Sequence, residues 1–196
     1  MIKFEPIFLE VETSTRVFKT ILDEPEMNKQ IVEQIDLSTD LQGRKSNVKA
    51  KMTDWCMHDK PGFDKLHNIL KTLFTSVFLY NHKVDKPYIV DELWGIKYES
   101  GDETVAHNHY PSTYSVSYYP KIDGYVPPLL FPEGKYKLEP KEGMLVIFPA
   151  WLNHRVPPTK FDGVRYTCSA NILVTQGKHY YNLAIDEKVT KKIRDK

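Results

Sequence analysis

Up to about residue 85, the apolar residues follow the spacing of amphipathic helices. Glu24-Pro25 marks one helix start, because proline is favoured at the first helical position, and the apolar stripe that follows is Met27, Ile31, Val32 and Ile35. Pro61 marks a second start, followed by a stronger stripe: Leu66, Ile69, Leu70, Leu73, Phe74, Val77 and Phe78. The pattern also predicts a short strand over Phe4–Val11 and a short helix over Thr13–Leu22.

From Tyr88 onward the pattern becomes that of strands. Runs rich in aromatic and β-branched residues alternate with segments rich in Gly, Pro, Asp and Asn, and the runs are Tyr88–Tyr98, Thr113–Tyr119, Met144–Phe148 and Arg165–Val174. Short strands at this spacing are typical of a β-sandwich or barrel. The sequence therefore predicts a mainly β fold with flanking helices (α+β), a jelly roll with the helices of the first half packed on one sheet.

No internal repeat and no Gly/Ser-rich linker divides the chain, so 1–196 is predicted to be a single domain. Within it we expect a mostly helical supporting segment over 1–85, a jelly-roll core over 86–176 and a C-terminal extension over 177–196. The last nine residues, Lys188–Lys196, carry five Lys or Arg, which predicts a frayed, solvated tail.

Charge and composition narrow the class of protein. The chain has 27 Lys+Arg against 26 Asp+Glu and a pI near 7.7, whereas nucleic-acid binders carry a basic excess, so a nucleic-acid partner is not expected. The longest apolar run, Met144–Phe148, is far shorter than the roughly 20 residues of a membrane helix. No signal peptide is expected, because Glu5 and Pro6 stand where it would have its apolar stretch, and no disulfide framework is expected, because Cys56 and Cys168 lie far apart. We therefore expect a soluble cytoplasmic protein with no membrane partner.

Candidate chemistry centres on three histidines and one arginine. His107 and His109 are two residues apart, so on a strand both imidazoles would point to the same face. Imidazole is a good ligand for iron, zinc, copper or nickel. His154 follows a predicted buried strand and a proline-bounded turn, and Arg165, eleven residues later, could clamp a carboxylate. The alternatives are that the first two are exposed loop histidines, that His154 is a core residue and that Arg165 forms a surface ion pair.

Taken together and in this order, the motifs of residues 88–175 resemble the double-stranded β-helix core of the 2-oxoglutarate- and iron(II)-dependent dioxygenases. The nearest branch is the prolyl-hydroxylase-like one, in the subset with a His-x-His segment. The segments that carry the resemblance are Tyr98…Gly101…His107-Asn108-His109, Ser115–Tyr119, Gly124 with Leu130-Phe131, Pro140-Lys141-Glu142-Gly143…Phe148-Pro149…His154-Arg155-Val156, and Gly163-Val164-Arg165-Tyr166-Thr167. The first half matches only loosely.

The resemblance implies a fold, an activity and a set of roles. The fold is the cupin-like jelly roll, and the activity is that of a hydroxylase that oxidises a C–H bond while Fe(II), O2 and 2-oxoglutarate give succinate and CO2. Iron would be held by His107, His154 and His109, the last of which stands where the family normally has Asp or Glu. The distal carboxylate of 2-oxoglutarate would pair with Arg165, with hydroxyl hydrogen bonds from Thr167, Tyr118 and Tyr98. Asn171 is a further candidate for the pocket.

The departure at His109 leaves three possibilities: a three-histidine site, a carboxylate reaching in from Asp102 or Glu103, or a position filled by water or chloride. Two other classes of protein also fit the pattern, a cupin-like three-histidine metalloenzyme that does not use 2-oxoglutarate and a non-catalytic jelly-roll binding protein. The primary substrate stays open between a peptide or protein side chain and a small molecule. The oligomeric state is open too, because either a sheet or a second subunit would cover the helix after Pro61.

Overall fold

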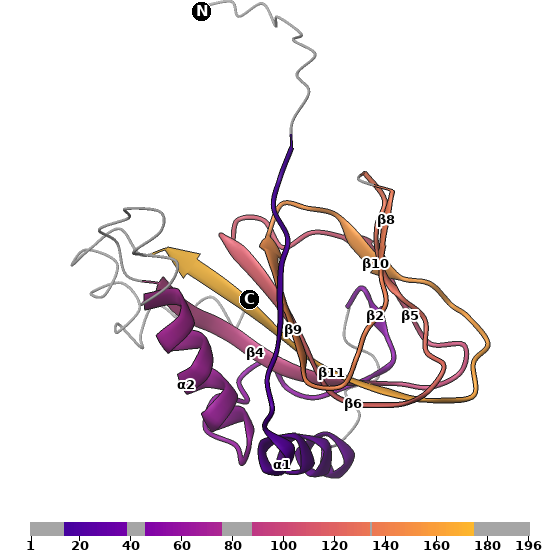
Figure 1. The fold of residues 1–196 in the computed structure, drawn as a ribbon, viewed down its shortest axis with the longest axis horizontal. Coiled ribbons are helices and arrows are strands. Elements are labelled where there is room, and N and C mark those ends of the chain that lie inside the picture. Colours follow the sequence, from indigo (N-terminus) through magenta and orange to yellow (C-terminus); the bar gives the residue numbers. More distant parts are fainter. Residues whose placement is uncertain (1–13, 39–45, 76–87, 134, 175–196) are drawn as a thin grey trace, which may run out of the picture.

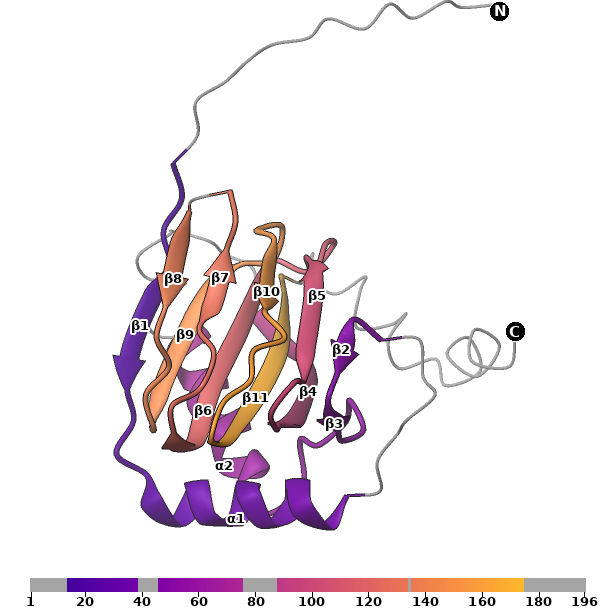
Figure 2. The same cartoon turned by 90° about the vertical axis from the view of Figure 1, so that its right-hand side faces the viewer.

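The computed structural model describes residues 14–38, 46–75, 88–133 and 135–174. Two β-sheets face each other, and Figure 2 shows the smaller one in front of the larger. The major sheet has the strand order β1 (Phe18–Ile21), β9 (Met144–Pro149), β6 (Tyr114–Gly124), β11 (Gly163–Val174), β4 (Tyr88–Tyr98) and β3 (Lys51–Met52). The minor sheet has the order β2 (Val48–Lys49), β5 (Glu103–His107), β10 (His154–Val156), β7 (Leu129–Phe131) and β8 (Tyr136–Leu138).

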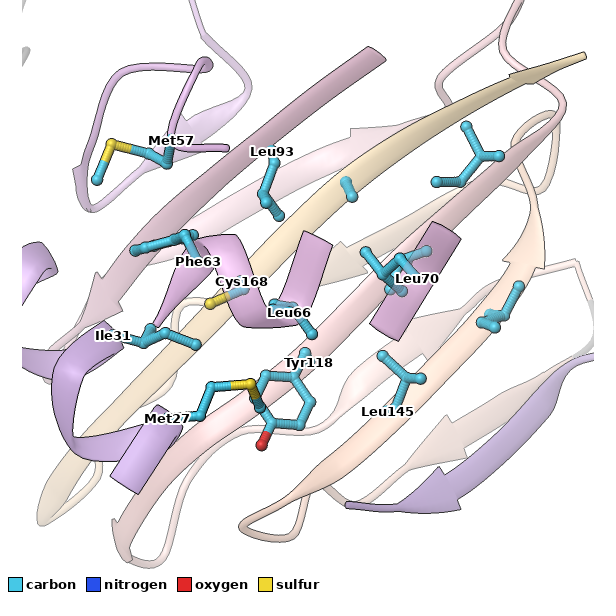
Figure 3. Close-up of a cluster of buried hydrophobic side chains, with 14 of the residues drawn as sticks. Met27, Ile31, Met57, Phe63, Leu66, Leu70, Leu93, Tyr118, Leu145 and Cys168 are labelled. Carbon is cyan, nitrogen blue, oxygen red and sulfur yellow. The ribbon is translucent and has the colours of Figure 1, made fainter. Parts of the chain in front are cut away.

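Helices α1 (Pro25–Leu37) and α2 (Phe63–Leu73) cover the face of the major sheet that points away from the minor sheet (Figure 1). We call this the outer face. Its apolar contacts form one continuous core, in which Ile31 of α1 and Leu70 of α2 are completely buried (Figure 3). Each such side chain contributes about 1.5–3 kcal/mol by leaving water. The approach is close enough that a Cβ on Gly95 of β4 would lie 2.4 Å from the Ile35 side chain, so only glycine fits there.

The opposite face of the major sheet, the inner face, looks into the space between the two sheets. A second core lies there, with side chains from both sheets: Trp94, Ile96, Tyr98, Tyr119 and Phe148 from the major sheet, and Leu129, Phe131, Leu138 and Val156 from the minor sheet. Because successive side chains of a strand point to opposite faces, every central strand contributes alternately to the helix-covered core and to the space between the sheets. The inner face is the one that carries the candidate site.

The predicted mainly β fold with flanking helices is confirmed. The first helix begins at Pro25 as expected, and the second begins at Phe63, two residues after Pro61. The four expected strands are present, but β6 continues past its predicted end to Gly124 and β11 begins at Gly163, before its predicted start. The expected strand over Phe4–Val11, the ends of the second stripe at Val77 and Phe78, and the tail Lys188–Lys196 lie outside the described residues. None of the described helices is long and apolar enough to cross a membrane.

One prediction is wrong: the segment Thr13–Leu22 contains no helix in its described part, and Phe18–Ile21 forms strand β1 instead. β1 pairs antiparallel with β9, with Phe18 opposite Ile147 and Ile21 opposite Met144, so backbone pairing along an open sheet edge overrides the local helical spacing. At the other edge, β3 pairs with β4. The first 85 residues therefore supply both edges of the major sheet in addition to the two helices.

Candidate metal centre and anion pocket

His107 and His154 lie side by side on neighbouring strands of the minor sheet. His107 is the last residue of β5, His154 is the first of β10, and the two are direct partners in the antiparallel register. His109 follows two residues after β5, where its backbone N–H donates to the Ala150 carbonyl at 2.7 Å. This bond ties the loop after β5 to the loop after β9. A second bond, from Asn108 Nδ2 to Asn153 Oδ1 at 3.1 Å, joins the same two loops.

The three imidazoles form one cluster. Their ring centroids lie 4.5 Å apart for His107 and His154, 4.8 Å for His107 and His109, and 5.1 Å for His109 and His154. All three candidate ligand nitrogens are within 4.8 Å of one another. His154 is buried and the other two are half-buried. The alternative that the first two are separate loop histidines is therefore not supported.

Two of the rings are oriented by the backbone carbonyl two residues before them. Nδ1 of His107 bonds the Val105 carbonyl at 2.8 Å, and Nδ1 of His154 bonds the Leu152 carbonyl at 3.1 Å. A carbonyl oxygen only accepts, so each Nδ1 carries the proton and each Nε2 keeps a free lone pair. In histidines that ligate metals, such a hydrogen bond to the ring nitrogen that does not bind the metal fixes the tautomer and the ring direction. The pair is thus prepared to present two Nε2 atoms to one ion.

Electrostatics keep the cluster neutral. Burial, followed by the neighbouring His154 and His107, lowers the pKa of His109 to about 3. Burial and then His107 lower the pKa of His154 to about 4, and burial also lowers the pKa of His107. Neutral imidazole is the form that binds a metal, whereas a protonated ring is repelled by it. At neutral pH all three rings are therefore in the ligand state.

Within the described residues, no carboxylate joins the histidine cluster. Asp102 lies in the turn before β5, where its Oδ2 accepts the Glu99 backbone N–H at 2.8 Å. Glu103 opens β5 opposite Lys49, at the end of the strand away from His107. Of the three possibilities for the position of the usual acid, the arrangement favours His109 itself over either carboxylate. The donor set then consists of three neutral nitrogens, which suits a divalent transition metal.

Arg165 lies deep between the sheets with only 1% of its surface exposed. Its Nε donates to Thr167 Oγ1 at 3.1 Å and one terminal nitrogen donates to the Pro127 carbonyl at 2.9 Å. The guanidinium carbon lies 5.0 Å from the ring centroids of both Tyr98 and Tyr119. Arg165 is therefore no part of a surface ion pair. No salt bridge among the described residues involves it, and a buried charge without a partner costs several kcal/mol.

The inner face also gathers unpaired polar atoms. In the part of the chain that the structure describes, the buried side-chain atoms without a hydrogen-bond partner are Trp94 Nε1, Ser115 Oγ, Tyr119 Oη and Asn171 Oδ1. All four lie on central strands of the major sheet, and strand alternation places them opposite the outer-face residues that precede or follow them. Leaving such an atom unpaired costs about 1–3 kcal/mol. The Tyr119 hydroxyl can donate beside the Arg165 cation, and these two groups mark that part of the inner face as a surface for an anionic ligand.

The structure brings three of the four predicted cosubstrate residues together. Thr167 bonds Arg165, and the Tyr98 ring covers its guanidinium while the Tyr98 hydroxyl bonds Thr104 Oγ1 of β5 at 2.5 Å, linking the two sheets. Tyr118 is the exception, and its predicted cosubstrate role is not supported. Its side chain lies in the outer core (Figure 3), where its hydroxyl donates to Asn28 Oδ1 of α1.

Tyr119 takes the place expected of Tyr118, because a shift of one residue along a strand reverses the face. A signal for it is present in the sequence. In Ser115–Tyr119, Val116 and Tyr118 share one face, while the two serines share the other with Tyr119. The more polar face is the one that borders the site.

A cavity of about 240 Å³ lies beside the histidine cluster. It is lined by Ser46, Asn47, Val48, Met52, Trp55, Glu92, Trp94, His107, Asn108, His109 and Asn171. Asn171, a candidate for the pocket from the sequence, is thus near the histidines, whereas Glu92 and the β2 segment had no signal in the sequence. A second cavity of about 560 Å³ lies between β1 and the β7–β8 hairpin and contains none of the predicted site residues.

Comparisons with known proteins agree with this geometry. A family model described as "Putative 2OG-Fe(II) oxygenase" matches residues 131–171, the segment that contains His154 and Arg165. Among curated proteins, none matches the chain. Of solved structures, a viral collagen prolyl hydroxylase from Paramecium Bursaria Chlorella virus-1, solved as a 2OG complex, is 18% identical with a TM-score of 0.59, covering 80% of this chain and 94% of its own.

Two further prolyl hydroxylases share the fold. A prolyl-4-hydroxylase of Pseudomonas putida is 13% identical with a TM-score of 0.62, covering 82% of this chain and 93% of its own. A prolyl hydroxylase of Trichoplax adhaerens, solved with a hypoxia inducible factor peptide, is 16% identical with a TM-score of 0.56, covering 81% and 83%. The double-stranded β-helix fold and the resemblance to the 2-oxoglutarate and iron(II) oxygenases are confirmed.

Proposed function

We propose that the protein is a 2-oxoglutarate- and iron(II)-dependent oxygenase that hydroxylates a C–H bond of its primary substrate. The observation that carries the proposal is Arg165, a buried cation with no acidic partner among the described residues, which shares the space between the two sheets with a cluster of three neutral histidines. An oxygenase of this kind needs one metal and one dicarboxylate. The two features supply a place for each, and the family model and the fold support the same class.

The residues fit the metal. His107, His109 and His154 would hold Fe(II) through ring nitrogens, with the Nε2 atoms of His107 and His154 already directed by the backbone. When bound, Fe(II) with O2 and 2-oxoglutarate supplies the oxidising power, and 2-oxoglutarate leaves as succinate and CO2. The protein supplies the positions of the reactants and a shielded site.

The chain's own contribution to cosubstrate binding begins at Arg165. Its remaining guanidinium N–H groups can grip a carboxylate with two parallel hydrogen bonds, which are stronger than neutral ones. Thr167 and the Pro127 carbonyl hold the guanidinium in place, and the rings of Tyr98 and Tyr119 keep water from it. The unpaired Tyr119 hydroxyl offers one more donor beside the same anion. In this shielded setting each charge-assisted bond is worth more than at the surface.

The third histidine changes the charge at the metal. An aspartate or glutamate would cancel one of the two charges of a divalent ion, and a neutral imidazole cancels none. A three-histidine centre thus keeps more positive charge, which favours a doubly negative cosubstrate. The same donor set is the observation that favours a second candidate, a cupin-like metalloenzyme that does not use 2-oxoglutarate. That candidate gives Arg165 no ligand.

The two candidates are separated by one assay on the full chain loaded with Fe(II). We expect succinate to form from 2-oxoglutarate and O2 even without primary substrate, and N-oxalylglycine, which mimics 2-oxoglutarate, to inhibit competitively. Replacement of His109 by Ala should lower the bound iron to a trace, while the control His58→Ala, whose ring packs on His67 outside the cluster, should bind iron fully. If no succinate formed and N-oxalylglycine did not bind, the proposal would be contradicted.

A further inference from the structure

The cavity beside the histidines contains a carboxylate–amide pair that the cosubstrate does not need. Glu92 of β4 and Asn171 of β11 are direct partners in the sheet register, and Asn171 Nδ2 donates to Glu92 Oε2 at 2.6 Å. Both line the cavity together with His107 and His109. Asn171 is six residues from Arg165 along the inner face of β11, about 20 Å at the rise of a strand. The pair is therefore separate from the anion pocket.

The pair leaves one buried hydrogen-bond acceptor without a donor among the described residues, with a second carboxylate oxygen beside it. As a carboxylate, Glu92 only accepts, so the hydrogen bond between them assigns the Asn171 nitrogen to Glu92 and leaves Asn171 Oδ1 as an acceptor. Asn171 is 6% exposed, and its Oδ1 has no partner within the part of the chain that the structure describes. The second Glu92 oxygen is a further acceptor next to it. A group that satisfies both must donate at least two hydrogen bonds.

The charge of the cavity selects the kind of donor. Among the described residues that line it, Glu92 is the sole carboxylate, and none is a lysine or arginine. The indole rings of Trp55 and Trp94 line the same space, and an aromatic face attracts a cation. An acidic or phosphorylated group would meet Glu92 unfavourably, and a purely apolar group would leave Asn171 Oδ1 unpaired. A positively charged group with N–H donors would offset the Glu92 charge, donate to Asn171 Oδ1 and pack on the indole faces.

We propose that Glu92 and Asn171 form the binding subsite for a cationic amino or guanidinium group of the primary substrate. This assignment rests on the proposed function, because it takes the histidine cluster as the reacting centre beside which the substrate binds. The cavity, at about 240 Å³, is smaller than the roughly 300–1,000 Å³ of sites for drug-sized ligands. It suits a single basic side chain of a peptide or a small amine.

Binding can be tested without turnover on the full chain loaded with Zn(II), which has no redox chemistry. The probes are the Nα-acetyl N-methylamides of lysine, arginine and norleucine, the last a neutral analogue of lysine, titrated by calorimetry. We expect at least one of the two cationic probes to bind tenfold or more tightly than the norleucine probe. The indole N–H resonance of Trp94 in a ¹H–¹⁵N spectrum should shift on binding, because that donor lines the same cavity.

Two matched variants locate the effect. Glu92→Gln keeps an oxygen for Asn171 and removes the charge, so the preference for the cationic probe should fall at least tenfold. Asp91→Asn removes the same charge from the neighbouring residue of β4, which is exposed and does not line the cavity, and it should leave the preference unchanged. If the two variants behave alike, or if no cationic probe is preferred, the subsite does not exist as proposed.

Two further readouts keep this inference apart from the proposed function. Zinc content should be equal in Glu92→Gln and the unaltered protein, and a loss of zinc would make Glu92 a metal ligand and overturn the subsite. Succinate formation from 2-oxoglutarate by the iron-loaded protein reports on the proposed function alone. Cation binding without succinate supports the subsite and contradicts the oxygenase. Succinate formation without a preference for cationic probes supports the oxygenase and contradicts the subsite.

Discussion

The two faces of the major sheet are built by the same strands and have opposite character. On the outer face, apolar side chains pack under α1 and α2, and the buried hydroxyl of Tyr118 has a partner in Asn28. On the inner face, four buried polar atoms have no partner among the described residues and the Arg165 cation has no counter-charge there. The outer face is complete without a ligand, and the inner face is not.

This difference separates the energetics of folding from those of binding. Substitutions on the outer face remove contacts that exist only in the folded chain, so they should lower stability and leave ligand affinity alone. Substitutions of the unpaired polar and charged groups on the inner face remove groups that already destabilise the folded protein without ligand. They should lower affinity and change stability little. Alternation along one strand makes adjacent residues fall on opposite sides of this division.

The largest effect is expected from Leu70 of α2, which is fully buried in the outer core. Leu70→Ala should lower the free energy of unfolding by about 2–5 kcal/mol, because transfer and cavity terms add. The matched control is Leu37→Ala at the end of α1, where leucine is 79% exposed and the loss should stay within about 0.5 kcal/mol. Denaturant titration measures both, and the affinity of folded protein for 2-oxoglutarate should be the same in both. An altered affinity in Leu70→Ala would break the separation of the faces.

The next effect is expected from Arg165 on the inner face. Arg165→Met should weaken binding of 2-oxoglutarate to the metal-loaded protein by roughly a hundredfold, or about 3 kcal/mol, because the carboxylate loses its buried partner. Without ligand, the free energy of unfolding should fall by less than about 1 kcal/mol, since an unpaired buried charge disappears at the same time. Calorimetry and denaturant titration give the two values. Arg155→Met, at the exposed central position of β10, is the control, and equal affinities in the two variants would exclude the anion pocket.

The sequence predicted the strands of the major sheet better than those of the minor sheet, for a physical reason. β4, β6 and β11 run for 11 or 12 residues, long enough for a pattern of apolar and aromatic residues to be visible. β7, β8 and β10 have three residues each, too few to show any period. Their positions depend on pairing between strands distant in the chain, as in β10 with β5. That information is not local.

For the candidate site too, the sequence predicted some features and missed others. Motif spacing was enough to select His107, His109 and His154, and the fold brings them together. Which side of a strand each neighbour occupies needed the sheet, so Tyr118 was chosen where Tyr119 lies. Glu92 was missed because its candidate role depends on one hydrogen bond, with Asn171 on the adjacent strand. The two residues are 79 positions apart in the sequence. Single residues carry no such signal until the strands are paired.

The smallest and sharpest effect compares those neighbouring tyrosines. Tyr118→Phe should lower the free energy of unfolding by about 1–2 kcal/mol, because the buried Asn28 loses the hydroxyl that it accepts from, and should leave the affinity for N-oxalylglycine unchanged. Tyr119→Phe should leave stability unchanged and lower that affinity about three- to tenfold, as expected for one lost hydrogen bond. The variants differ from the unaltered protein by one oxygen each, on adjacent residues, so each controls for the other. If Tyr118→Phe weakened N-oxalylglycine binding and Tyr119→Phe did not, the assignment of the ligand to the inner face would be wrong.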